Sequence, residues 1–195
     1  MERAQLEELL YQSLETERGG VRIYEKAVMS AQNDDLKKEW SEYLEQTRNH
    51  ERIMLRVLGV FGLSPDTETP GRQIIRAKGQ ALVDSMDASK ADPVAAQLVA
   101  AECVVEAESK DHMNWELIGE VAGKLTGDER KTLQDAHSEV EEQEDEHLYH
   151  TMGWARELWL ESLGLPAVLP PPEEKKHTKS AIGAERAKQD RKKML

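Results

Sequence analysis

Apolar residues recur three and four residues apart over four long stretches of this chain, which is the spacing of one buried face of an α-helix. Asn33 or Asp34 caps the start of the second stretch. Asp92 followed by Pro93 begins the third stretch, and Gly164 ends the fourth. We therefore predict an all-α protein whose long helices cover residues 3–31, 33–62, 92–123 and 126–164.

The connections between the stretches differ in length, and this difference constrains the topology. A few residues join the first stretch to the second, and the third to the fourth, so each pair is a predicted antiparallel hairpin. Residues 62–92 join the two hairpins as a long crossover, which contains a predicted short helix over residues 71–86. We therefore expect a four-helix bundle formed by residues 1–165.

The chain changes character after residue 165. The segment PAVLPPPEEKK is typical of an extended, semi-rigid chain, and the residues after it are polar and basic. We predict that residues 166–195 form a flexible C-terminal tail that is disordered when alone and able to form a short helix on another protein.

Charge is unevenly distributed along the chain. The net charge is −12 at pH 7, but the residues from Glu173 onwards carry eight Lys or Arg against four Asp or Glu, so the rest of the chain carries −16. An acidic body argues against nucleic-acid binding by the folded part, and it is compatible with attracting cations.

The sequence shows no targeting or membrane segment. No apolar run approaches the roughly 18 residues that span a membrane. The N-terminus MERAQLEELL lacks the basic start and the apolar segment of an export signal. Cys103 is the only cysteine, so no intrachain disulfide can form. These features favour a cytoplasmic protein without membrane contact.

Each predicted long helix carries an ionisable residue in the middle of its apolar seam. A buried ionised carboxylate is unfavourable unless it is paired or binds a metal. Carboxylate oxygen together with imidazole nitrogen suits iron, manganese or zinc. The candidate metal ligands are Glu17, His50, Glu108, His112, Glu144 and His147.

Several candidates have an alternative that the sequence leaves open. Glu144 and His147 could instead form a buried hydrogen-bonded pair. His50 could be a core histidine whose nitrogens are satisfied by neighbours. Glu15 competes with Glu17 if the helix register is shifted.

Other ionisable residues are placed outside the predicted centre or compete with it. Glu102 and Glu106 compete with Glu108, because the third helix has a second, acidic seam. His137 and His150 lie a turn or more from the predicted centre and are not expected to be ligands. The remaining acids of the fourth helix fall off its seam and are predicted to be solvated: Glu141, Glu142, Asp145 and Glu146.

The two predicted hairpins repeat each other. Glu17 and Glu108 are each followed by an aromatic residue, Tyr24 or Trp115, seven positions later. Residues three apart share one face of a helix. A carboxylate from one helix and a Glu-x-x-His from the next is the pattern that binds two metals in a bundle core. The second helices carry the matching spacings Thr47-x-x-His50 and Glu144-x-x-His147.

On these residues the chain resembles the ferritin-like superfamily over residues 3–163, and its hairpin pattern is similar to that of rubrerythrins and bacterioferritins. Its layout also looks like that of small ferritin-like stress proteins with a short helix in the crossover. The resemblance implies a ferritin-like four-helix bundle with a di-iron centre that oxidises Fe(II), or reduces oxygen or peroxide, in oxidative or metal stress. Glu17 and His50 would hold one metal. Glu108 and His147 would hold the other, with Glu144 as the bridge.

One position departs from the family pattern. Thr47 stands where the resemblance implies a Glu, and it supplies neither a negative charge nor a bridge. His112, one turn after Glu108, could replace the missing ligand. Three Glu with three His would favour Fe(II) or Zn(II) over Fe(III), and the set could hold one metal rather than two.

Two further expectations concern partners and the competing function. The resemblance implies assembly into a homo-oligomer. The competing hypothesis is a structural stress protein that has a structural zinc or no metal, and whose tail docks on a partner.

Overall fold

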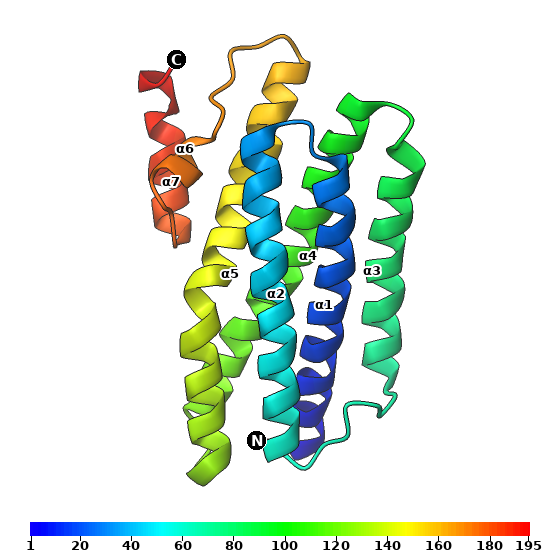
Figure 1. Cartoon of the computed structure of the whole chain (residues 1–195). Helices are drawn as coiled ribbons and strands as arrows, with labels where there is room; N and C mark the ends of the chain where they lie inside the picture. Colours follow the sequence, from blue (N-terminus) through cyan, green and yellow to red (C-terminus); the bar gives the residue numbers. More distant parts are fainter.

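The computed structural model describes residues 1–195 and is all-helical, with no strand. The prediction of an all-α protein is therefore confirmed. The crossover contains α3, Pro70–Ser89, which is longer than the predicted short helix over residues 71–86. Four long helices lie side by side (Figure 1), and they are α1 Arg3–Ser30, α2 Asp34–Val60, α4 Pro93–Ala122 and α5 Gly127–Ser162.

The long helices form a closed ring. α1 contacts α2 and α4, and α5 contacts α4 and α2, while α3 lies outside the ring against α1 and α4. α1 and α5 run in one direction and α2 and α4 in the other (Figure 1). One face of each long helix is therefore directed towards a common axis. No helix has an apolar stretch long enough to cross a membrane.

Side-chain caps account for where two of these helices begin. The side chain of Asn33 accepts hydrogen bonds from the backbone N–H groups of Asp35 and Leu36 at the start of α2. Asp92 caps α4 in the same way, and Pro93 occupies its first turn, where no N–H donor is needed. The sequence signals for these two ends correspond to real hydrogen bonds.

The apolar core has two parts with a polar layer between them. One cluster is built around Tyr24, Trp40 and Trp154. The other is built around Leu14 and Trp115. Along every long helix, buried polar side chains separate the residues of the first cluster from those of the second. Apolar residues therefore close the polar layer on both sides along the bundle axis.

Helix α3 is attached to α1 through a buried ion pair. Arg72 donates to Glu15 at 2.9 Å, and the side chains of both residues are 2% exposed. Arg72 also donates to the backbone carbonyls of Pro65 and Thr67. Glu15, the sequence alternative to Glu17, thus faces α3 rather than the bundle axis.

The C-terminal residues differ from the prediction of a flexible, disordered tail. They form α6, Pro172–Lys175, and α7, Ala181–Asp190, followed by the 3-10 turn η1, Arg191–Lys193. Both α6 and α7 contact α5, and they lie beside its C-terminal half (Figure 1).

Opposite charges account for this packing of the tail. Arg156 of α5 donates to Glu173 of α6 at 2.7 Å. Arg191 donates to the fully buried Glu157 of α5, also at 2.7 Å. Lys179 donates to Glu142 at 2.9 Å. The prediction of disorder rested on the polar, basic composition of the tail, whereas Glu142 and Glu157 of α5 supply partners for Lys179 and Arg191 within the same chain.

Candidate metal centre

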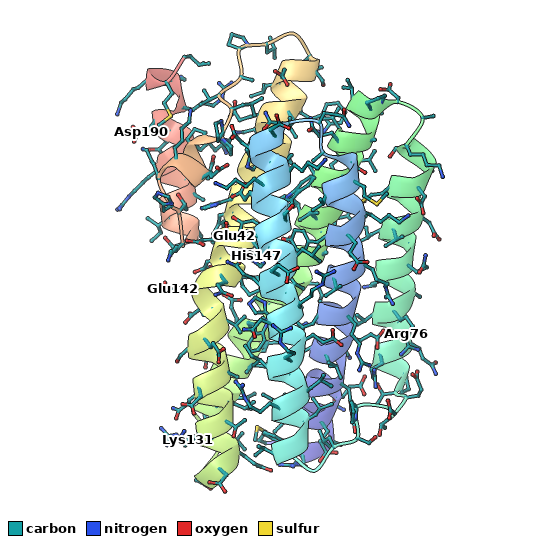
Figure 2. The ribbon with its side chains drawn as sticks, viewed as in Figure 1. Glu42, Arg76, Lys131, Glu142, His147 and Asp190 are labelled. Atoms are coloured by element: carbon teal, nitrogen blue, oxygen red, sulfur yellow. The ribbon has the colours of Figure 1, made fainter.

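The polar layer lies at the middle of the four long helices, and all of them contribute side chains that could hold a metal ion. Figure 2 shows His147 between α5 and α2, and Glu142 on the outer side of α5. Five of the six predicted ligands are buried together in this layer: Glu17 on α1, His50 on α2, Glu108 on α4, and Glu144 and His147 on α5.

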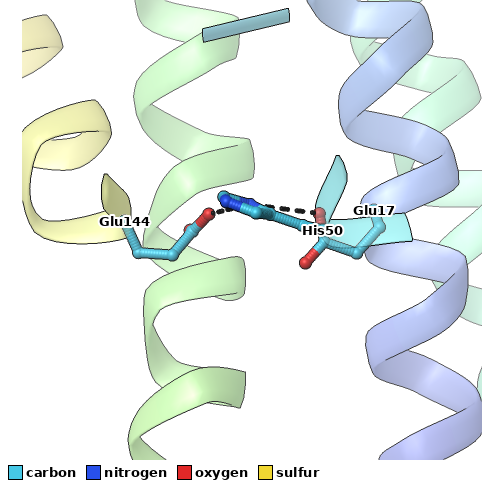
Figure 3. A group of neighbouring side chains, drawn as sticks. All are labelled: Glu17, His50 and Glu144. Atoms are coloured by element: carbon cyan, nitrogen blue, oxygen red, sulfur yellow. Dashed lines mark ion pairs between the residues drawn. The ribbon is translucent and has the colours of Figure 1, made fainter. Parts of the chain in front are cut away.

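The first group of ligand atoms consists of Glu17, His50 and Glu144. Nδ1 of His50 lies 2.9 Å from Oε1 of Glu144 and 3.8 Å from Oε2 of Glu17. The imidazole ring therefore lies between the two carboxylates (Figure 3). One ligand atom from each residue lies within 4.8 Å of the others, which allows all three to bind one metal ion.

The second group consists of Glu108, Glu144 and His147. Nδ1 of His147 lies 3.6 Å from Oε2 of Glu108 and 3.7 Å from Oε1 of Glu144. These ligand atoms also lie within 4.8 Å of one another. Glu144 belongs to both groups, so its carboxylate is placed between two possible metal positions.

Many polar atoms of this layer have no hydrogen-bond partner. His50 Nδ1 and Glu144 Oε1 are close, but their geometry is not that of a hydrogen bond. A buried polar atom without a partner is destabilising, and a convergent group of such atoms fits a bound cation. The unpartnered atoms are Oε2 of Glu17, Nδ1 of His50, Oε2 of Glu108, Oδ1 of Asp111, both carboxylate oxygens of Glu144, and Nδ1 of His147.

Two glutamine side chains determine which imidazole nitrogen faces the carboxylates. Nε2 of His50 donates to Gln143 at 2.7 Å, and Nε2 of His147 donates to Gln46 at 2.6 Å. Because an amide oxygen only accepts, Nε2 carries the proton in each ring and Nδ1 keeps a lone pair for a metal. Gln46 precedes His50 by four residues, as Gln143 precedes His147. This Gln-x-x-x-His spacing is a part of the hairpin repeat that the sequence analysis missed.

Helix α4 places Asp111 in the polar layer, and not the predicted His112. Asp111 is 4% exposed, and its Oδ1 has no hydrogen-bond partner. His112 lies at the edge of the bundle, where its ring is 3.6 Å from Glu116 and 3.5 Å from Asp145. The prediction that His112 lies on the inner seam is therefore wrong.

The cause of this error is the register of α4. The observed seam of α4 and a seam that runs through His112 have Ala101, Glu108 and Trp115 in common. Between these positions, both choices keep a spacing of three and four residues. Ile118 is a stronger core residue than Gly119, and this contrast identifies the observed register. The buried positions are Val104, Asp111 and Ile118, whereas an inward His112 would bring Val105 and Gly119 into the seam instead.

Residues predicted to lie outside the centre are found away from it. Glu102 and Glu106 are exposed, which leaves Glu108 as an inward carboxylate of α4. His150 is buried, but its ring contacts the hydroxyl of Tyr43 and not the ligand groups. The remaining residues that were predicted to lie outside the centre are exposed or half-buried: His137, Glu141, Glu142, Asp145 and Glu146.

Burial and mutual repulsion oppose ionisation of the inner carboxyl groups. Burial, and then the charges of Asp111 and Glu144, raise the pKa of Glu17. Burial, and then the charges of Glu144 and Glu108, raise the pKa of Asp111. Burial and the charge of Glu108 also raise the pKa of Glu144. A cation bound among these groups would reverse the repulsion and favour their ionised forms.

Two aromatic side chains lie beside the carboxyl groups of Glu17 and Glu108. Nε1 of Trp115 donates to Oε1 of Glu17 at 2.9 Å, which fixes the orientation of that carboxylate. The hydroxyl of Tyr24 is buried without a hydrogen-bond partner. Burial and the charge of Glu108 raise the pKa of Tyr24, so its hydroxyl keeps its proton.

Thr47 occupies the position of the implied Glu without offering a metal ligand. Its hydroxyl donates to the backbone carbonyl of Tyr43 at 2.9 Å. Its methyl group packs against Gly20, where an added Cβ would lie only 3.1 Å from Cγ2 of Thr47. Thr47 therefore serves the packing of α1 against α2, and Asp111 supplies an additional carboxyl group to the layer.

No protein-family model, curated protein or solved structure matches this chain. The resemblance to the ferritin-like superfamily therefore stays a prediction from the residues. What the site can do chemically follows from its own buried carboxylate and imidazole atoms.

Proposed function

We propose that this protein is a ferritin-like bundle that holds two divalent transition-metal ions, with Glu144 between them. The observation that carries the proposal is that two buried Glu/His groups share Glu144. Glu17 and His50 complete one group, and Glu108 and His147 complete the other. Bundle proteins that bind two metals use a Glu and a Glu-x-x-His from each half. This chain has that set in its second half and Glu17 with Thr47-x-x-His50 in its first.

Charge balance supports two ions of charge +2. Glu17, Glu108, Asp111 and Glu144 are all buried in the layer. When they are ionised, their charges balance those of two divalent ions, so the loaded centre is neutral in a core where net charge is unfavourable. Oxygen and imidazole donors suit Fe(II), Mn(II) and Zn(II), and we propose iron as the working metal.

The proposed activity is the oxidation of Fe(II) coupled to the reduction of peroxide or oxygen, in oxidative or metal stress. When iron is bound, each Fe(II) supplies one electron, and one hydrogen peroxide with two protons takes up both electrons and becomes two waters. The apolar clusters on either side exclude bulk water. Gln46 and Gln143 orient the two imidazoles. Tyr24 holds a proton beside Glu108.

Metal stoichiometry combined with peroxide consumption tests this proposal. We expect about two Fe per chain after anaerobic loading with Fe(II), and one peroxide consumed for every two Fe(II) oxidised. Glu144→Gln keeps the size of the side chain and removes its charge, so it should bind at most about one Fe. Glu142→Gln changes an exposed acid on the same helix and is the matched control. The proposal fails if the parent binds no more iron than Glu144→Gln.

A structural metal site is the competing function, and Thr47 is the observation that favours it. Thr47 leaves the position of the implied Glu without a ligand. For a structural site we expect metal binding and thermal stabilisation, but no consumption of peroxide. The same loading experiment therefore separates the two functions.

A further inference from the structure

A cavity of about 330 Å³ lies between α4 and α5. Its inner wall includes Trp115 and Glu144, and its outer wall includes His112 and Asp145. Residues 180–182 of the tail border it on the outside. The cavity therefore reaches from the buried metal-binding layer to the surface of the protein.

The inner end of this cavity is a carboxylate without a partner. Glu144 is 1% exposed, and neither of its carboxylate oxygens has a hydrogen-bond partner. The two unpartnered oxygens of Glu144 offer ligand atoms at the end of the cavity, and a bound cation favours the ionised carboxylate. Such a cavity attracts a cation more strongly than a neutral molecule or an anion.

The outer wall holds a second set of metal-ligand atoms. Nδ1 of His112 lies 3.5 Å from Oδ1 of Asp145, and Nε2 lies 3.6 Å from Oε1 of Glu116. Hydrogen bonds are shorter than this. Two atoms that bind one ion at about 2.1 Å in tetrahedral geometry are about 3.4 Å apart. The spacing of His112 and Asp145 therefore fits a shared cation better than a direct hydrogen bond.

The surface that leads to this cavity is acidic. A second cavity, of about 860 Å³, continues along α4 and α5 and shares Glu116, His137 and Glu141 with the first. It adds Glu120, and neither cavity is lined by Lys or Arg. A groove lined by charges of one sign raises the local concentration of ions of the opposite sign.

We propose that His112 and Asp145 form an outer cation site, which captures a divalent metal ion from this groove and delivers it to Glu144. The inference rests on the proposed function, because it assigns an entry path to the same ions. An imidazole with a carboxylate selects Fe(II), Co(II) or Zn(II) over Mg(II) and Ca(II), which prefer oxygen ligands. Delivery is an exchange of ligands and involves no change of oxidation state.

The rate of metal uptake by the full chain tests the delivery step. Co(II) is the probe, because its visible absorption changes when it binds. His112→Gln and Asp145→Asn should each slow loading of the centre by about tenfold, and the final amount of Co(II) in the centre itself should be unchanged. His177→Gln and Asp135→Asn make the same chemical changes at exposed positions and serve as controls. Loading rates within twofold of the parent in both test variants would overturn the proposal.

Equilibrium binding separates this inference from the proposed function. In Glu144→Gln the shared carboxylate of the centre is neutral, yet the outer site should still bind one Co(II) that is lost on adding His112→Gln. If the parent protein binds Co(II) at the outer site but its centre does not load, the result contradicts the proposed function and supports the outer site. If the centre loads but His112→Gln removes no bound Co(II), the outer site is overturned and the proposed function is not. Far-ultraviolet circular dichroism establishes that each variant is folded.

Discussion

The amide oxygen of Gln46 on α2 accepts a hydrogen bond from Nε2 of His147 on the neighbouring helix α5. Gln143 makes the reciprocal contact with His50, so each hairpin orients the imidazole of the other. Residues that hold a metal-binding histidine in place typically contribute 10- to 100-fold to metal affinity.

We therefore expect Gln46→Leu and Gln143→Leu each to weaken metal binding by roughly 10- to 100-fold. Leucine has a similar size but cannot accept the proton of Nε2, so the ring loses its fixed orientation. Competition with a chromophoric chelator measures the affinity. Gln73→Leu on the exposed face of α3 is the control, and it should bind metal as the parent does. Equal affinities in all three variants would exclude an orienting role.

Metal binding should stabilise the fold, because the ligand atoms come together only in the folded chain. At a free metal concentration of 100 times the Kd, the expected stabilisation is about 2.7 kcal/mol. For a chain of this length the melting temperature should rise by roughly 5 to 11 °C. Scanning calorimetry with and without a chelator measures the shift. Glu144→Gln should show a smaller rise, and a parent that melts at one temperature under both conditions would refute the expectation.

Arg72→Met should destabilise the protein strongly. It removes the buried partner of the Glu15 carboxylate and two hydrogen bonds to loop carbonyls. Breaking one side of a buried ion pair costs about 3 to 5 kcal/mol. Urea unfolding measures the loss. Arg76 also contacts Glu15 but is 41% exposed, so Arg76→Met should cost less.

The double variant Glu15→Leu/Arg72→Met provides the control for that prediction. Both buried charges are then absent, so part of the lost stability should return. A double variant as unstable as the sum of the two single changes would show that the ion pair is not the cause.

Docking of the tail should weaken as the pH rises from 5 to 8. Burial, and then the charge of Glu39, raise the pKa of Glu174 from 4.5 to about 8 in the docked tail. The docked state thus favours the protonated carboxyl, and its stability falls as pH rises through this window. Amide hydrogen exchange of α6 and α7, corrected for intrinsic rates, measures docking. Glu174→Gln should remove the pH dependence, whereas Glu185→Gln, exposed on α7, should retain it.

Local signals in the sequence are sufficient to predict the helices and most of the buried layer. The caps at Asn33 and Asp92 and the short connections determine where the helices begin and which of them are neighbours. The pairing of Glu144 with His147 follows from a spacing of three residues on one helix. These features depend on residues close together in the chain, and they can therefore be predicted from the sequence.

The errors arise where two local choices are almost equal and a distant contact decides between them. Asp111 and His112 both fit a spacing of three and four residues, and only the packing of Ile118 into the core selects Asp111. Likewise, the tail is polar and basic by composition, but it folds because Arg191 and Lys179 have acidic partners on α5. The tail contacts join residues 34 and 37 positions apart, which local patterns do not predict, whereas the contrast between Ile118 and Gly119 is present in the sequence.

Glu144 belongs to the second hairpin, yet it completes a ligand group whose other members, Glu17 and His50, belong to the first. Each hairpin consists of contacts that are local in sequence, and such contacts form early in folding. An ion held by the first hairpin alone would have two protein ligands, and it would gain the third only when the hairpins dock. A bound metal would therefore stabilise contacts that form only when the hairpins dock. It would lower the rate of unfolding far more than it raises the rate of folding.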